Sequence, residues 1–291
     1  LDTAKSISLF HGMDHIDWPQ VFSSYTSAFA QYDAPSGSVL PLIAVPTTAG
    51  TGSELTQAMV ISDPDKNAKE CIYHDKVFAK EAVIDVELMA TLPPRMTAVT
   101  GFDAFTHDFE SYLRDLASTY TRLIGRKSMA LILTSLPKLC QDPKNMELRE
   151  NMALAAMFAG ISLGNASACL PHPLSEIMGG VAPRLAHGQC LATIYPQFLR
   201  WQCTQSVEKC ADVARLLDQS LLHVPDQEAA SALPQLMVRF LQDVGLYHSF
   251  RELGVTEEEM AEALKAPVLN FLPFAPKDVM VGILRDSYDF A

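Results

Sequence analysis

The residues of this chain best placed to do chemistry are Asp103 and His107, four positions apart in a mostly apolar run. Pro93 and Pro94 precede the run, and proline suits the first turn of a helix because its missing N–H is not needed there. Apolar residues then recur at roughly helical spacing, at Met96, Val99, Phe102, Phe105, Phe109 and Tyr112. Residues i and i+4 share a helix face, about 6 Å apart along the axis. This carboxylate and imidazole could therefore bind one divalent cation, although such pairs also occur by chance in many helices.

Two further histidines lie among small or apolar residues and could complete a metal site. His172 follows a segment rich in small residues, and His187 begins an apolar helical run. Each alone is more often a packing residue than a ligand. Together with Asp103 and His107 they form a set of three imidazoles and one carboxylate, which suits Fe(II) or Zn(II) and leaves a position open for a substrate oxygen.

A loop rich in hydroxyl groups and glycine could bind a nucleotide or a nicotinamide group. It reads Thr47-Thr48-Ala49-Gly50-Thr51-Gly52-Ser53-Glu54-Leu55-Thr56. Glycines let a backbone approach a ligand closely, and hydroxyl and N–H groups hold anions or amides. The loop has neither a P-loop ending nor a G-x-G-x-x-G pattern. From composition alone, an ordinary turn rich in Gly, Ser and Thr is the favoured interpretation.

The elements that must position these groups change character near residue 93. Buried strands are predicted at 38–46 and 81–85, and a third strand at 57–63 with a turn at 63–67. Beyond them, helical periodicity predicts helices at 95–115, 118–140, 146–167, 187–202, 205–220, 227–245, 256–265 and 276–288. We therefore expect an α/β part followed by an all-helical part, with domains at 1–93 and 94–291.

The composition limits the possible functions. The chain of 291 residues is 48% hydrophobic and 19% charged, which predicts a globular protein with a sizeable core. Its net charge of −12 argues against nonspecific binding of nucleic acid or anionic lipid. We expect no membrane span and no signal peptide. The six cysteines lack metal-site or disulfide spacing, which predicts reduced thiols in a cytoplasmic protein.

Taken together, these segments resemble the iron-containing, metal-dependent (group III) alcohol dehydrogenase family, which is related to glycerol dehydrogenase and dehydroquinate synthase. Gly101–His107 is similar to the family's G-x-D-A-x-x-H segment. Pro171-His172-Pro173-Leu174 and Ala186-His187-Gly188 resemble the segments that hold its third and fourth metal ligands. Pro46–Glu54 is nearly identical to its cofactor-contacting loop, and Lys69 has the spacing of a lysine near the cofactor.

The resemblance implies a metal-dependent, NAD(P)-linked alcohol dehydrogenase or aldehyde reductase acting on a small alcohol or aldehyde. It implies Fe(II), with Zn(II) as the alternative, and leaves NAD versus NADP open. The implied catalytic and metal-ligating residues are Asp103, His107, His172 and His187. The implied cofactor contacts are Asp2, Thr47, Thr48, Thr51, Gly52, Ser53 and Lys69. A homodimer or larger homo-oligomer is also implied.

Three departures from the family pattern keep other interpretations open. The opening Leu1–Lys5 resembles the end of the family's G-G-G-S-x-x-D-x-A-K motif, so we expect a Rossmann-like domain truncated at its N-terminus. Glu176 stands where many relatives have a His or a Tyr near the nicotinamide, and the spacing from His172 to His187 is one residue longer than is common. The alternatives are a relative with other metal and NAD chemistry, similar to glycerol dehydrogenase or a sugar-phosphate synthase, and a catalytically silent homologue.

Overall fold

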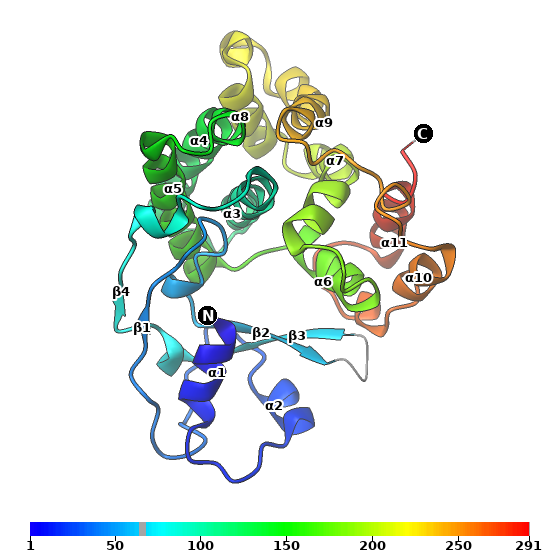
Figure 1. Cartoon of the computed structure of the whole chain (residues 1–291). Helices are drawn as coiled ribbons and strands as arrows, with labels where there is room; N and C mark the ends of the chain where they lie inside the picture. Colours follow the sequence, from blue (N-terminus) through cyan, green and yellow to red (C-terminus); the bar gives the residue numbers. More distant parts are fainter. Residues whose placement is uncertain (64–67, 291) are drawn as a thin grey trace.

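A small α/β segment at the N-terminus leads into a larger array of helices (Figure 1). The computed structural model describes residues 1–63 and 68–290. The elements before residue 94 are α1 (Asp2–Phe10), α2 (Trp18–Ser24), β1 (Ile43–Ala44), β2 (Ala58–Asp63), β3 (Ala68–Tyr73) and β4 (Glu81–Ala82). The later elements are α3 (Pro94–Leu113), α4 (Thr119–Gln141), α5 (Met146–Ala166), α6 (Pro171–Val181), α7 (His187–Gln205), α8 (Val207–Leu217), α9 (Asp226–Asp243), α10 (Glu257–Ala263) and α11 (Lys277–Asp286).

The predicted helices are confirmed to within a few residues, but α6 was missed. The sequence of α6 contains Pro171 and Pro173 near its start and Gly179-Gly180 near its end. These residues weaken a helical pattern in an isolated segment, although proline is well tolerated in a first turn. Tertiary packing overrides the weak propensity, because most of the α6 side chains are buried.

The N-terminal segment is organised around the hairpin of β2 and β3. The two strands pair antiparallel with Met59 opposite Ile72, and the strand predicted at 57–63 is thereby confirmed. The turn predicted at 63–67 lies largely outside the described residues. Helices α1 and α2 pack on the hairpin through a small apolar core of Leu9, Phe10, Val21, Met59, Ile72 and Val77.

The two predicted buried strands at 38–46 and 81–85 are wrong in length and in burial. The structure has the two-residue strands β1 and β4, which pair parallel with each other. Ile43 is 61% exposed and both residues of β4 are exposed. Pro41 and Pro46 flank β1 and remove backbone donors on both sides, which keeps the ladder short. In the described residues no further strand pairs with β1 or β4, and of the aliphatic residues in this run only Ala44 is fully buried.

Helix α3 lies at the centre of the helical part, in contact with α4, α5 and α7. Its rings Phe102, Phe105 and Phe109 are fully buried and stack along the helix, with centroids 5.7 and 6.0 Å apart. Tyr195 of α7 meets Phe102 edge-on at 5.2 Å. The predicted apolar face of this helix is confirmed, except that Met96 at its start is 42% exposed.

The predicted domain boundary at residue 93 remains a prediction. The helical core and the small N-terminal core are separate apolar clusters, but Ala49 and Met89, from before residue 94, belong to the helical one. The loop that contains Ala49 therefore packs on the helices. Among the helices that the structure describes, none is by itself long and apolar enough to cross a membrane.

Candidate metal centre

Asp103 and His107 lie on the buried face of α3 that is turned away from the stacked rings. Their side chains are 5% and 7% exposed, and His107 Nε2 lies 3.8 Å from Asp103 Oδ1. The i, i+4 spacing places both groups over the same turn, as expected from the sequence. Thr106 donates its hydroxyl to the Asp103 carbonyl within the helix at 2.7 Å.

His172 reaches Asp103 from the first turn of α6, because the chain turns sharply between α5 and α6. The two helices are bent by 103° at this break. Ser167 at the break has φ 64°, a left-handed conformation that is uncommon for a residue with a side chain. Its carbonyl accepts a hydrogen bond from Ser111 of α3 at 3.3 Å. His172 Nε2 thereby comes to 3.8 Å from Asp103 Oδ1.

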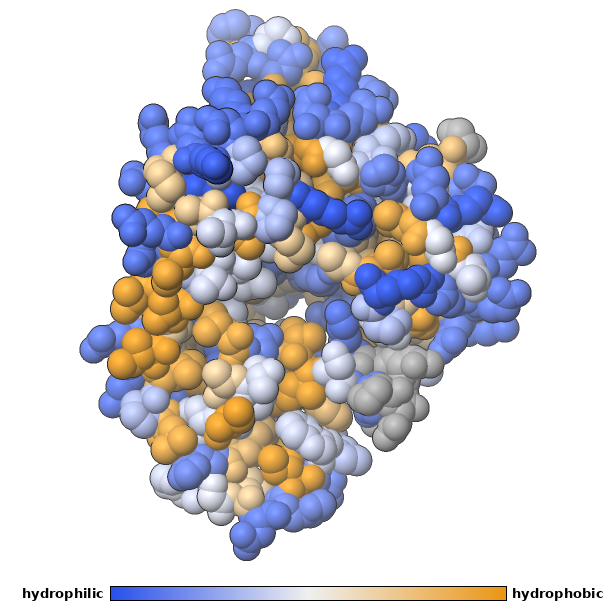
Figure 2. Space-filling model, viewed as in Figure 1, coloured by the Kyte–Doolittle hydropathy of each residue, from blue (hydrophilic) through white to orange (hydrophobic). Residues whose placement is uncertain are grey.

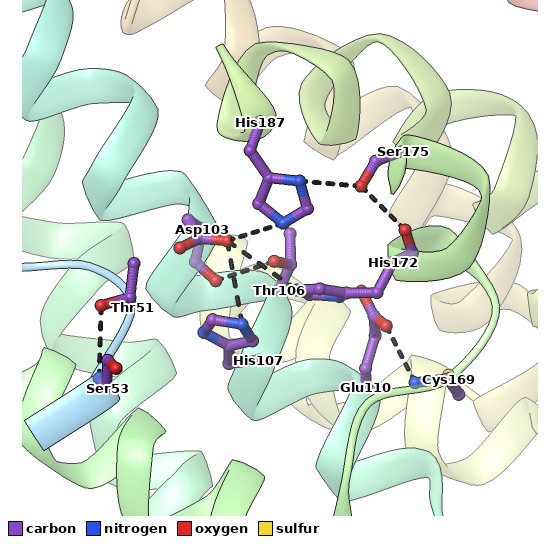
Figure 3. A network of polar contacts seen from close by, with 10 residues as sticks. All are labelled: Thr51, Ser53, Asp103, Thr106, His107, Glu110, Cys169, His172, Ser175 and His187. Atoms are coloured by element: carbon purple, nitrogen blue, oxygen red, sulfur yellow. Dashed lines mark hydrogen bonds and ion pairs between the residues drawn. The ribbon is translucent and has the colours of Figure 1, made fainter. Parts of the chain in front are cut away.

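His187 is the first residue of α7, and close backbone packing brings it to the same point. A Cβ on the next residue, Gly188, would lie 2.0 Å from the carbonyl oxygen of Val99 on α3, so only glycine allows this approach. His187 Nε2 lies 3.6 Å from Asp103 Oδ1, and its side chain is 32% exposed. Figure 3 shows the three imidazoles directed at the Asp103 carboxylate.

The donor atoms fit a bound divalent cation. The ligand atoms of Asp103, His107 and His172 lie within 4.8 Å of one another. Among the described residues, Asp103 Oδ1 and His172 Nε2 are buried and have no hydrogen-bond partner. Buried polar atoms are rarely left in that state. Donors that share one ion at about 2.1 Å are separated by about 3.0–3.5 Å, so the observed 3.6–3.8 Å distances need to close by a small amount.

Two side chains around the centre fix which imidazole nitrogens face inward. Glu110 accepts from His172 Nδ1 at 2.8 Å and from the backbone N–H of Cys169 at 2.9 Å. Ser175 donates its hydroxyl to the His172 carbonyl at 2.9 Å, so at 3.0 Å it accepts from His187 Nδ1. Both imidazoles therefore carry a proton on Nδ1 and direct Nε2 at Asp103, the arrangement that metal-binding histidines use.

The electrostatics of the centre favour an anionic carboxylate beside two neutral imidazoles and one protonated imidazole. Burial alone would raise the pKa of Asp103, but the three histidines outweigh it and hold that pKa well below its usual value. Burial lowers the pKa of His107 to about 3 and that of His187 to about 4. Burial also lowers the pKa of His172, but Glu110 and Asp103 outweigh it and raise that pKa to about 10. A metal ion at His172 Nε2 therefore has to displace a proton.

Glu110 was not predicted from the sequence. It lies three residues after His107 on the same helix, and its side chain is fully buried. A carboxylate one turn beyond a candidate ligand, in an otherwise apolar run, is the signal that could have identified it.

The residues expected to contact a cofactor fall into two groups. Thr47, Thr48 and Thr51 lie at the surface or close to it, and Thr51 accepts from the Ser53 N–H at 3.2 Å. Gly52 and Ser53 are buried where the loop packs on α5.

Asp2 and Lys69 lie on either side of the hairpin. Asp2 accepts from the Ser53 hydroxyl at 2.7 Å and from the Val60 N–H at 2.9 Å, so it ties the loop to β2. Lys69 on β3 reaches α6, with Nζ 3.0 Å from where a Cβ on Gly179 would lie. The structure thus brings the four proposed ligands together, and cofactor contact by these seven residues remains a prediction.

Comparison with known proteins assigns nearly the whole chain to one group. Residues 97–288 match the model described as "Fe-containing alcohol dehydrogenase family, C-terminal", and residues 1–86 match "Iron-containing alcohol dehydrogenase". Choline dehydrogenase of Bacillus subtilis is 31% identical over 277 residues, which cover 92% of this chain and 65% of the relative. Alcohol dehydrogenase 4 of Saccharomyces cerevisiae is 31% identical over 299 residues, which cover 99% and 73%.

Solved structures show the same fold. A 1,3-propanediol oxidoreductase matches with a TM-score of 0.87 and 25% identity, covering 98% of this chain and 74% of the other. The alcohol dehydrogenase from Oenococcus oeni matches with a TM-score of 0.84 and 27% identity, covering 99% and 74%. The chain spans 58% to 65% of the length of several curated relatives.

Proposed function

Because the chain belongs to the iron-containing alcohol dehydrogenase family, we propose that it carries the metal centre of an enzyme that transfers hydride between a nicotinamide cofactor and a small alcohol or aldehyde. The observation that carries this proposal is the convergence of three imidazole Nε2 atoms on one buried carboxylate oxygen. When bound, Fe(II) or Zn(II) supplies Lewis-acid polarisation of the substrate oxygen. NAD or NADP supplies the hydride chemistry.

The chain's own residues hold and orient these groups. Asp103, His107, His172 and His187 would hold the metal, and the burial of the first three keeps water from their donor atoms. The loop from Thr47 to Ser53 would hold the nicotinamide side of the cofactor. It is well placed for this, because Gly50 lies against Thr100 of α3, one helical turn before Asp103. The six cysteines are free, which fits the expected cytoplasmic location, and we expect a homodimer or larger assembly.

The main alternative, a synthase acting on a sugar phosphate, has less support from the charges near the site. Such a site needs cationic side chains free to bind phosphate. Arg184 is engaged by Glu259 at 2.6 and 2.7 Å and by the Gly254 carbonyl at 2.6 Å. Lys69 acts electrostatically on His187, and the structure gives it no hydrogen bond or ion pair among the described residues.

The proposal is tested by metal removal and replacement in the complete protein. We expect purified protein to contain iron or zinc and to reduce short aldehydes with NADH or NADPH. A chelator should abolish turnover, and added Fe(II) or Zn(II) should restore it. The proposal would be contradicted if the purified protein bound neither metal and reduced no aldehyde with either cofactor.

Glu110 provides a second test at the edge of the centre. Glu110→Gln should weaken metal binding by about 10- to 100-fold, the usual cost of losing a partner behind a metal-binding histidine. A glutamine has one acceptor oxygen, so it cannot accept from both His172 Nδ1 and the Cys169 N–H as the carboxylate does. Metal content against free metal concentration measures the change. Glu150→Gln, on the exposed surface of α5, is the matched control, and equal affinities in both variants would contradict the role of Glu110.

A further inference from the structure

Three buried oxygen atoms gather where helices α3, α4 and α5 pack against one another (Figure 1). They are both carboxylate oxygens of Asp108 on α3 and the hydroxyl oxygen of Ser162 on α5. Both side chains are fully buried, and none of the three atoms has a hydrogen-bond partner among the described residues. Asp108 follows His107 by one residue, so it points about 100° round the helix from it, away from the metal centre. Buried polar atoms are rarely left without a partner, and this cluster therefore indicates a bound species.

Gly125 of α4 borders the space between these oxygens. A Cβ on Gly125 would lie 3.2 Å from Asp108 Oδ1 and 3.3 Å from Ser162 Oγ, and the next atom outside its own helix is the Asp108 carbonyl oxygen at 3.8 Å. Ser128, almost one turn further along α4, also acts on the Asp108 carboxylate, and its hydroxyl donates to the Ala155 carbonyl at 2.9 Å. The lone pairs of that hydroxyl stay available. Every side-chain donor around this space is thus an oxygen atom.

The Asp108 carboxylate has no compensating charge. In the part of the chain that the structure describes, the groups that act on it are the hydroxyls of Ser128 and Ser162, and no cationic side chain is among them. Hydrophilic residues cover much of the outer surface of the helical part in Figure 2, where a carboxylate would be hydrated. An unpaired carboxylate inside the protein is costly. A water molecule would leave its charge uncompensated, whereas a single positive ion would neutralise it.

We propose that Asp108, Ser128 and Ser162 bind one monovalent alkali cation, Na⁺ or K⁺, between α3, α4 and α5. Carboxylate and hydroxyl oxygens suit a hard cation, which binds oxygen at about 2.4 Å, and do not suit the metals that prefer imidazole. One carboxylate balances one positive charge, so a divalent ion would leave a surplus charge buried. Because the surrounding side chains are fully buried, the cation enters as the three helices assemble, and it stabilises the folded state.

Thermal unfolding in different chloride salts tests this inference. The complete, metal-loaded protein is refolded at equal ionic strength in NaCl, in KCl or in choline chloride, whose cation is too large for the site. We expect the Tm of the wild-type protein to rise by about 4 °C as Na⁺ or K⁺ replaces choline from about 1 to 100 mM, since a ligand with millimolar affinity for the folded state alone shifts stability by that order.

Two substitutions locate the cation. Asp108→Asn keeps the shape of the side chain and removes its charge, and Gly125→Ala places a Cβ against Asp108 Oδ1 and Ser162 Oγ. Both variants should have the same Tm in all three salts. Gly282→Ala is the control for a glycine-to-alanine change in a helix, because its new Cβ would meet no atom within 4 Å among the described residues. This control should keep the full dependence on the alkali cation.

Each result decides for or against the site. A wild-type Tm that is equal in the three salts overturns the inference, and Asp108 is then neutralised by a proton. A dependence on Na⁺ or K⁺ that survives in Asp108→Asn also overturns it, because the cation then binds elsewhere. If that variant does not fold, Gly125→Ala decides the location in the same way. None of these measurements uses turnover, so they are independent of the dehydrogenase function.

Discussion

Replacing His187 by alanine should remove the bound metal and lower kcat by roughly 10³-fold, while the helical fold stays intact. A Lewis-acid metal contributes several kcal/mol to the transition state, and each 1.4 kcal/mol or so corresponds to tenfold in rate. His187 is the best ligand to remove, because its side chain is 32% exposed and stands at the first residue of α7. The other ligands are buried, so their loss would disturb packing as well. Elemental analysis of the purified variant measures the metal, and circular dichroism checks the fold.

His248→Ala is the matched control for this experiment. His248 is an exposed histidine of the same helical part, and the hydrogen bond it makes to Thr193 uses its backbone carbonyl, which alanine retains. The control should keep wild-type metal content and rate. If His187→Ala also kept both, the fourth ligand would be a different residue and the centre would have to be reassigned.

Gly160→Ala should weaken cofactor binding by about 10²-fold without loss of metal, the cost of misplacing a binding group by about 1 Å. A Cβ on Gly160 of α5 would lie 2.5 Å from the Gly52 carbonyl oxygen and 2.9 Å from its Cα. Gly52 itself has φ 58°, and a Cβ there would lie 2.3 Å from the Gly160 Cα. The loop backbone therefore rests directly on the helix backbone. Titration with NADH or NADPH, followed by fluorescence, measures the change in Kd.

Gly282→Ala separates the clash from the general effect of alanine in a helix. Alanine is favoured over glycine in a helix by up to about 1 kcal/mol, so Gly160→Ala should be stabilising unless the loop is displaced. Gly282 lies in α11, where a new Cβ would meet no atom within 4 Å among the described residues. Gly282→Ala should leave cofactor binding unchanged. Equal cofactor affinity in the two variants would show that the close packing of the loop on α5 does not contribute to cofactor binding.

The sequence predicted the two ligands that lie on one helix well, and the two that come from other helices less directly. The pair Asp103 and His107 follows from helical periodicity, which is a local property. His172 and His187 were candidates from their small or apolar surroundings, and the family resemblance was needed to identify them as ligands, because their approach depends on tertiary contacts. Those contacts are the turn at Ser167 and the close packing of Gly188 against the Val99 backbone. Neither produces a periodic pattern in the sequence.

The failures at the level of the fold have the same origin. An aliphatic run such as 38–46 predicts a buried strand only if a sheet and a covering layer surround it, and composition does not report either. Helix α6 was missed because its prolines and glycines disfavour an isolated helix, although burial against its neighbours stabilises it. Glu110 and Ser175 act through the imidazoles of other elements, so their roles became visible once α3, α6 and α7 were placed together.

Helix α3 carries ligands on one face and core side chains on another, and this limits where the protein can tolerate substitutions. One face of the helix presents Asp103, His107 and Glu110 to the centre, and another carries the stacked rings from Phe102 to Phe109. A random library aimed at new substrate preferences should therefore give mostly inactive clones in residues 97–111, nearly all of which are buried. Productive diversity should concentrate at the half-buried positions 173, 176 and 181 of α6 and at Thr47, Thr48 and Thr51 of the hydroxyl-rich loop, which lie outside the buried core.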